Sequence, residues 1–155
     1  MKDIILNNGS AIPCIGFGTC THGKNVDFEK IICGAIDVGY RYFDTASMYK
    51  TESLLGNAIK KSGVDRKDLI IASKAWYDET GKDKIREALY KSLDRLGLDY
   101  LDVYLIHWPK RSTDDEGWKE NVVETWKTME ELHKQGLIKS LGLSNFLPHH
   151  TEVNE

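Results

Sequence analysis

The sequence predicts an α/β fold built on a parallel sheet. Short apolar runs that suit strands alternate four times with segments whose apolar residues recur at helical spacing, and a fifth apolar run follows. Asp44, Lys74 and His107 each come directly after or at the end of such a run, at intervals of 30 and 33 residues, about one strand and one helix. Successive units would therefore present an acid, a cation and an imidazole along one edge of the sheet.

A β-hairpin is expected ahead of this sheet. Residues 4–6 and 11–13 are short apolar runs, and Asn8-Gly9 between them can supply the positive φ angles of a two-residue turn. We expect this hairpin to cover one end of the sheet.

Five strands are predicted at residues 14–18, 40–43, 69–73, 101–106 and 137–143. Four helices lie between them, and the first has Asn25 or Asp27 as its N-cap. Each helix ends near a glycine, which adopts the left-handed conformation without strain: Gly39, Gly63, Gly97 and Gly136. Pro148 suits the first turn of a fifth helix.

Composition indicates an ordinary globular chain, and we expect one domain over residues 1–155. The chain has 155 residues, of which 41% are hydrophobic and 29% charged, with a net charge of −3. This charge gives no electrostatic footprint for nucleic acid. No run approaches the roughly 18 apolar residues of a membrane span, so we expect a cytoplasmic protein that does not bind membranes.

No metal site is expected. Cys14, Cys20 and Cys33 have neither the spacing of a disulfide framework nor that of a zinc site, and they are predicted to be reduced thiols. His133 and the pair at 149–150 lack nearby cysteines or carboxylates at metal-ligand spacing.

Two architectures fit this order of elements. A doubly wound open sheet of five strands suits the length, and it would place the first strand between two others. A (β/α)8 barrel needs about 250 residues, so this chain would contain only its first five strands. Polar residues at the carboxyl ends of strands fit both, because both folds place their sites there.

Five segments, in this order, resemble the aldo-keto reductase family. They are Gly16–Thr19, Phe43–Tyr49, Ser73–Trp76, Leu105–Pro109 and Gly142–Phe146. The resemblance runs from the hairpin to about His150. It implies a partial (β/α)8 TIM barrel, with an N-terminal hairpin, strands 1 to 5 and helices 1 to 4, forming a single incomplete domain.

The resemblance implies NADPH-dependent reduction of aldehydes and ketones to alcohols, without metal or flavin. The catalytic residues of the family fall on Asp44, Tyr49, Lys74 and His107. Hydride transfer to a carbonyl carbon leaves an alkoxide, which a phenol can protonate if its pKa is lowered from about 10. Lys74 would lower the pKa of Tyr49, Asp44 would keep Lys74 charged and oriented, and His107 would position the substrate oxygen.

Further positions take their roles from the same resemblance. Trp76 and Trp108 would line the carbonyl pocket. Ser144 and Asn145 would bind the nicotinamide carboxamide, with Thr19 and Asp44 near the nicotinamide ribose.

This sequence also departs from the family. Cys20 stands where many relatives have tryptophan, and Lys50-Thr51 replaces the commoner Gly-Asn after the tyrosine. Strands six to eight, which in the family stack an aromatic residue on the nicotinamide and bind the adenosine 2′-phosphate, have no counterpart here.

Two functions therefore stay open: a carbonyl reductase, or a catalytically inactive half-barrel that acts, if at all, through self-association. In either case the unpaired strand edges predict association with a second copy or with a missing C-terminal half.

Overall fold

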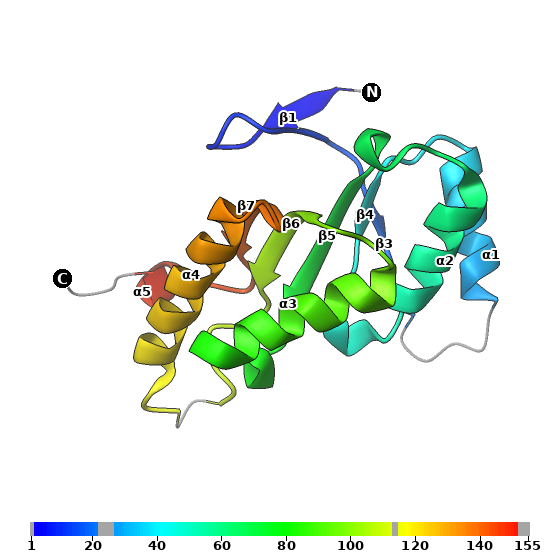
Figure 1. Cartoon of the computed structure of the whole chain (residues 1–155). Helices are drawn as coiled ribbons and strands as arrows, with labels where there is room; N and C mark the ends of the chain where they lie inside the picture. Colours follow the sequence, from blue (N-terminus) through cyan, green and yellow to red (C-terminus); the bar gives the residue numbers. More distant parts are fainter. Residues whose placement is uncertain (1, 22–26, 113–114, 152–155) are drawn as a thin grey trace.

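The computed structural model describes residues 2–21, 27–112 and 115–151. A two-stranded hairpin precedes a parallel sheet of five strands (Figure 1). In their order of pairing, the strands of this sheet are β3 (Phe17–Gly18), β4 (Tyr42–Asp44), β5 (Ile70–Ala75), β6 (Leu101–Ile106) and β7 (Ile138–Leu143). The helices are α1 (Phe28–Asp37), α2 (Glu52–Ser62), α3 (Lys82–Leu96), α4 (Trp118–Lys134) and α5 (Pro148–Thr151). Short 3₁₀ turns are η1 (Ser47–Tyr49), η2 (Arg66–Asp68) and η3 (Tyr77–Glu79).

The strands lie in space in the order in which they occur in the chain. All four pairings are parallel, and β3 and β7 form the two edges of the sheet in the described part of the chain. A doubly wound sheet would have its first strand in the interior, so that alternative is wrong. Sequential parallel order is that of a barrel opened after its fifth strand.

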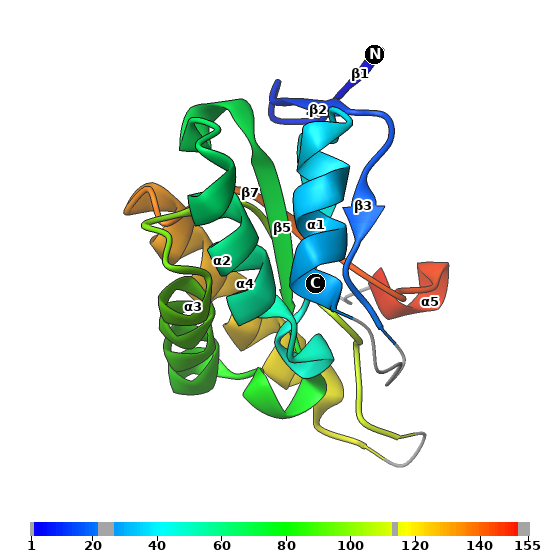
Figure 2. The ribbon, with the colours of Figure 1, turned by 90° about the vertical axis from the view of Figure 1, so that its right-hand side faces the viewer.

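The four long helices pack side by side in chain order. Helix α1 contacts α2, α2 contacts α3, and α3 contacts α4. Figure 2 shows α1, α2 and α3 following one another across the view. Each strand–helix unit is therefore supported mainly by its immediate neighbours.

The hydrophobic core lies between these helices and the sheet. Each helix contributes a fully buried side chain, and so do the central strands: Ile32, Leu55, Leu89, Leu132, Phe43, Ile71 and Tyr104. Burying one such aliphatic or aromatic side chain stabilises the fold by about 1.5–3 kcal/mol. This packing fixes where the carboxyl ends of the strands lie, and hence where the site residues begin.

Helix boundaries follow the predicted caps. The Asp27 side chain accepts a hydrogen bond from the backbone N–H of Lys30 at 3.2 Å, so Asp27 is the N-cap of α1; the alternative, Asn25, lies outside the described residues. Gly63 and Gly97 are the C-caps of α2 and α3, with φ of 66° and 64°. These two endings confirm the prediction from glycine positions.

The hairpin β1 (Asp3–Ile5) and β2 (Ala11–Pro13) has a longer loop than predicted. The N–H of Leu6 donates to the carbonyl of Ser10 at 2.8 Å, which leaves a three-residue loop in which Gly9 alone has a positive φ, 84°. The predicted two-residue turn is therefore wrong. Asn8 instead uses its side-chain amide, which donates to the Lys139 carbonyl and the Ser140 hydroxyl, at 3.1 and 2.9 Å.

That contact places the hairpin near the amino-terminal end of β7. The site residues lie at the opposite, carboxyl ends of the strands, so the hairpin covers the other end of the sheet, as predicted. The first strand of the sheet is shorter than the expected 14–18. Cys14 still belongs to the hairpin, because its N–H bonds the carbonyl of Lys2 at 3.1 Å. Gly16 lies over the ring of Tyr42, where a Cβ would be 2.5 Å from a ring carbon.

Across the described residues, none of the helices combines the length and the apolar character that crossing a membrane requires.

Candidate active site

Three neighbouring strands deliver charged and polar side chains to one edge of the sheet. Asp44 is the last residue of β4, Lys74 is the penultimate residue of β5, and His107 follows β6. The ladder continues past the strand ends, since the N–H of Thr45 bonds the Ala72 carbonyl at 2.9 Å and that of His107 bonds the Ala75 carbonyl at 3.0 Å. The positions of these side chains are thus set by the sheet itself.

Lys74 and Asp44 form an ion pair at this edge. The Lys74 ammonium contacts Asp44 Oδ1 and also donates to the carbonyl of Thr45 at 3.0 Å. Its side chain is only 8% exposed, whereas that of Asp44 is 31% exposed. A buried ammonium needs both a counter-charge and hydrogen bonds, and it has both here.

Tyr49 reaches the same place from η1, the short turn after β4. The Lys74 Nζ lies 5.2 Å from the centre of the Tyr49 ring, and the ring meets His107 edge-to-face with a centroid distance of 5.7 Å. The structure therefore brings Asp44, Tyr49, Lys74 and His107 together. Lys50, which follows, has a left-handed φ of 57°, a conformation that glycine adopts without strain.

The pKa of Tyr49 is raised in this arrangement. Burial is the first cause, and the negative charge of Asp44 and the nearby Cys20 add to it. The expectation that Lys74 lowers this pKa is therefore wrong here, because burial, and after it the carboxylate of Asp44, raise it. Tyr49 is a protonated phenol over the physiological pH range.

His107 is held in its neutral form. It is 94% buried, and its Nδ1 has no hydrogen-bond partner among the residues the structure describes. Burial, followed by the positive charge of Lys74, lowers its pKa to about 4, while Asp44 acts in the opposite direction. A neutral imidazole has one N–H to donate, so His107 can act as a hydrogen-bond donor to a ligand in the cavity.

We expect this shift to make the stability of the chain depend on pH. The unfolded chain, with a histidine pKa near 6.5, binds the proton more readily than the folded one. The stability due to neutral His107 is therefore fully present above about pH 6.5 and is lost as the pH falls toward 4, by about 1–3 kcal/mol. Urea unfolding across this range measures the free energy directly. His107→Gln should lack this pH dependence of the free energy of unfolding, and His133→Gln should retain it. The same dependence on pH in both variants would contradict the expectation.

A cavity of about 520 Å³ opens at this edge. It is lined by Cys20, Thr21, Met48, Tyr49, Trp76, His107 and Trp108. Trp76 packs edge-to-face on His107 at 4.8 Å between ring centroids, and Trp108 is 42% exposed. The two tryptophans predicted for the pocket thus share a cavity with Tyr49. No pattern in the sequence marked Thr21 or Met48 as lining residues.

Thr19 does not face this cavity with its side chain. It is completely buried, and its hydroxyl lies 2.9 Å from that of Thr51, which in turn lies 3.3 Å from that of Thr45. These three hydroxyls tie β3 to the loop after β4. Any contact of Thr19 with a nicotinamide ribose would have to come from its backbone.

Ser144 and Asn145 lie at the end of β7, beside His107. Asn145 has a left-handed φ of 60°, and its amide donates to the His107 carbonyl at 2.9 Å and to the Ser144 hydroxyl at 3.1 Å. Asn145 lines a second cavity, of about 500 Å³, and Trp108 lines both this cavity and the one that contains Tyr49. These two predicted residues are therefore neighbours of the cluster of Asp44, Tyr49, Lys74 and His107 without lining the same cavity.

Sequence reasoning missed a supporting contact under Trp76. Glu79 in η3 contacts the Ser47 hydroxyl and accepts a hydrogen bond from the Trp76 N–H at 2.8 Å. It thereby joins the turn that carries Tyr49 to the loop that follows Lys74. The three-residue spacing between Trp76 and Glu79 is typical of helix capping and could have indicated this role.

This combination of fold and site defines a class of protein: (β/α)8-barrel enzymes, which carry their catalytic residues at the carboxyl ends of the strands. Residues 14–153 match the profile of the Aldo/keto reductase family, and the chain belongs to that family.

Relatives and solved structures agree with this assignment. The chain is 42% identical to a glyoxal reductase of Bacillus subtilis, over 98% of this chain and 52% of that protein. It is 44% identical to the methylglyoxal reductase DkgA of Escherichia coli O157:H7, over 96% of this chain and 51% of that protein.

Two crystal structures show the same arrangement of elements. An aldo/keto reductase from Brucella melitensis aligns with a TM-score of 0.88 and 36% identity, over 97% of this chain and 56% of that one. A Bombyx mori aldo-keto reductase in complex with NADP aligns with a TM-score of 0.84 and 37% identity, over 94% of this chain and 50% of that one. The predicted partial barrel is confirmed, and the chain spans about half the length of the curated relatives it matches.

Proposed function

We propose that this chain carries the catalytic residues of an NADPH-dependent reductase of aldehydes and ketones. One observation carries the proposal: a phenol, a neutral imidazole and a buried ammonium–carboxylate pair meet beside one cavity at the carboxyl edge of the sheet. Its relatives include proteins named glyoxal reductase and methylglyoxal reductase. Small dicarbonyl compounds are therefore the first substrates to test.

The residues present suit the nicotinamide end of the cofactor. When bound, NADPH would supply the hydride that reduces the carbonyl carbon. Ser144 and Asn145 would hold the carboxamide, and the contact of Asn145 with the His107 carbonyl fixes its position next to the site. Asp44 and the backbone of Thr19 would lie near the ribose. In the family, residues of later strands bind the adenosine 2′-phosphate, and these strands lie outside the region this chain matches.

In this proposal Tyr49 is the general acid. Reduction of a carbonyl group produces an alkoxide whose conjugate acid is about as weak as water, with a pKa near 15.7. Transfer of the phenol proton to such an oxygen is downhill even though burial raises the pKa of Tyr49. His107 would donate its N–H to the same oxygen and orient it, while the Asp44–Lys74 pair would hold Tyr49 in place.

Aldehyde-dependent oxidation of NADPH by the purified chain tests the proposal. We expect NADPH absorbance to fall on addition of methylglyoxal, at a rate proportional to the concentration of the chain. A binding titration that follows NADPH fluorescence separates a failure to bind from a failure to react. If the titration shows binding but no aldehyde is reduced, the assigned catalytic roles are wrong.

The second candidate is a catalytically inactive half-barrel that acts, if at all, through self-association. It is favoured by the two edges of the described sheet, where β3 and β7 each pair with one strand only. No binding of NADPH at high micromolar concentration, together with a concentration-dependent mass above 17.6 kDa in sedimentation, would support this candidate over the reductase.

A further inference from the structure

The turn η1, which carries Tyr49, is a single 3₁₀ turn without a side-chain cap. Within it, the N–H of Tyr49 donates to the Ala46 carbonyl at 3.0 Å and the N–H of Lys50 to the Ser47 carbonyl at 3.3 Å. A helical segment this short is marginally stable by itself. In the described part of the chain, Ser47 is the one side chain of residues 46–50 that hydrogen-bonds outside the turn. The position of Tyr49 therefore depends on the contacts of Ser47.

The Ser47 hydroxyl reaches both β5 and η3. It lies 3.3 Å from the Lys74 carbonyl and donates to Glu79 Oε2. The same oxygen of Glu79 accepts the N–H of Trp76 at 2.8 Å. A carboxylate oxygen can accept two donors, so one atom joins the turn of Tyr49 to the chain that follows Lys74.

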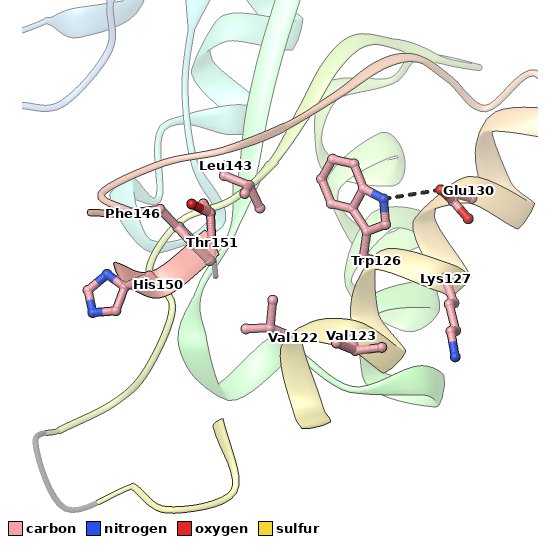
Figure 3. A pocket seen from close by; sticks show the side chains of 9 residues that line it. All are labelled: Val122, Val123, Trp126, Lys127, Glu130, Leu143, Phe146, His150 and Thr151. Atoms are coloured by element: carbon pink, nitrogen blue, oxygen red, sulfur yellow. Dashed lines mark hydrogen bonds between the residues drawn. The ribbon is translucent and has the colours of Figure 1, made fainter. Parts of the chain in front are cut away.

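The segment that carries Glu79 is itself fixed to α4. The Thr80 hydroxyl accepts a hydrogen bond from the Asn121 amide at 2.6 Å, and the N–H of Gly81 donates to the Thr125 hydroxyl at 2.7 Å. Both threonines are buried. A different side of the same helix lines the apolar pocket shown in Figure 3, which takes no part in these contacts. The carboxylate of Glu79 is therefore held in place independently of η1.

We propose that Ser47 and Glu79 are positioning residues, which hold the Tyr49 phenol where it meets Lys74 and His107. The inference rests on the proposed reductase function and adds the residues that keep its general acid in place. Such an acid must stay within hydrogen-bond reach of the substrate oxygen, and a displacement of about 1 Å can cost about 10²-fold in rate. Neither Ser47 nor Glu79 is among the described residues that line the cavity, so both act through Tyr49.

Ser47→Ala is expected to lower kcat with methylglyoxal by about 10–100-fold and to leave KM within about twofold, because it displaces a group that acts in the transition state. Glu79→Ala should lower kcat in the same way, and the double variant should lose less than the two single losses combined, since both remove one contact. Glu79→Gln keeps an oxygen acceptor and should recover most of the rate. In a Tyr49→Phe background, Ser47→Ala should change nothing further; the full loss there would overturn the proposal.

Ser62→Ala is the matched control. The Ser62 hydroxyl donates to the Ile59 carbonyl at 2.7 Å and accepts the N–H of Val64 at 3.2 Å, at the end of α2 and outside the cavity. Its kcat should equal that of the unsubstituted chain. Equal losses in Ser47→Ala and Ser62→Ala would show a general effect on the fold and would contradict a positioning role.

NMR of the chain labelled in its tyrosine and histidine rings tests the position of Tyr49 without turnover. Nuclear Overhauser effects between the rings of Tyr49 and His107, which meet edge-to-face, should be present in the unsubstituted chain and in Ser62→Ala but lost in Ser47→Ala. If they behave in this way while no aldehyde is reduced, the proposed function fails and the positioning role stands. Unchanged effects in Ser47→Ala would overturn the positioning role at any level of activity. If Ser47→Ala does not fold, Glu79→Ala provides the same comparison.

Discussion

Replacing Tyr49 by phenylalanine is expected to lower the rate of aldehyde reduction by about 10²–10⁴-fold, the contribution typical of a positioned general acid. The substitution removes only the hydroxyl. The ring keeps its edge-to-face contact with His107 at 5.7 Å and its position 5.2 Å from the Lys74 ammonium. Steady-state kinetics with methylglyoxal give the rate, and fluorescence titration gives the affinity for NADPH, which should stay similar.

A second tyrosine provides the control for this experiment. Tyr42 of β4 is also partly buried, but it lies outside the cavity, against Gly16, so Tyr42→Phe should leave the rate unchanged. Because burial raises the pKa of Tyr49, the reduction rate of the unsubstituted chain should not fall through loss of the phenol proton anywhere below about pH 10. Equal turnover by Tyr49→Phe would rule out the acid assignment.

Gly56→Ala is expected to destabilise the chain by about 2 kcal/mol, although glycine to alanine usually stabilises a helix. Gly56 lies within α2, where alanine would gain up to about 1 kcal/mol of helix propensity. A Cβ at this position would lie 2.3 Å from the carbonyl oxygen of Leu96 and 2.7 Å from its carbonyl carbon. These are backbone atoms at the end of α3, so relief requires the two helices to move apart, and overpacking costs about 1–3 kcal/mol or more.

Gly34→Ala in α1 isolates the propensity effect. A Cβ there meets nothing within 4 Å, so this variant should gain about 0.5–1 kcal/mol. Urea unfolding of both variants measures the two free-energy changes. If Gly56→Ala also stabilised the chain, the contact between α2 and α3 would adjust more easily than the packing indicates.

Local features of the fold could be predicted because their causes are local. A residue that ends a helix in the left-handed conformation is usually glycine, which is why Gly63 and Gly97 marked the ends of α2 and α3. The hairpin was predicted with the wrong loop length. Its loop is set by a further backbone hydrogen bond, from Leu6 to Ser10, and by the contact of Asn8 with β7. The second contact involves a distant strand, so the sequence of the hairpin alone does not indicate it.

The identity of the site residues was easier to predict than their environment. Asp44, Lys74 and His107 stood out because each ends or follows an apolar run. The orientation of Thr19 depends on Thr51, 32 residues away, and the sequence gives no sign of that pairing. The direction of the Tyr49 pKa shift depends on the balance of burial, Asp44 and Lys74, which only the three-dimensional arrangement sets.

The hydrogen bonds of Asn8 join residues separated by 131 and 132 positions in the chain. Bringing such distant segments together costs entropy until the intervening units have formed. During synthesis the hairpin therefore has no docking place until Ser140 has left the ribosome. The hairpin precedes the sheet in the chain, yet it is among the last segments to reach its final position.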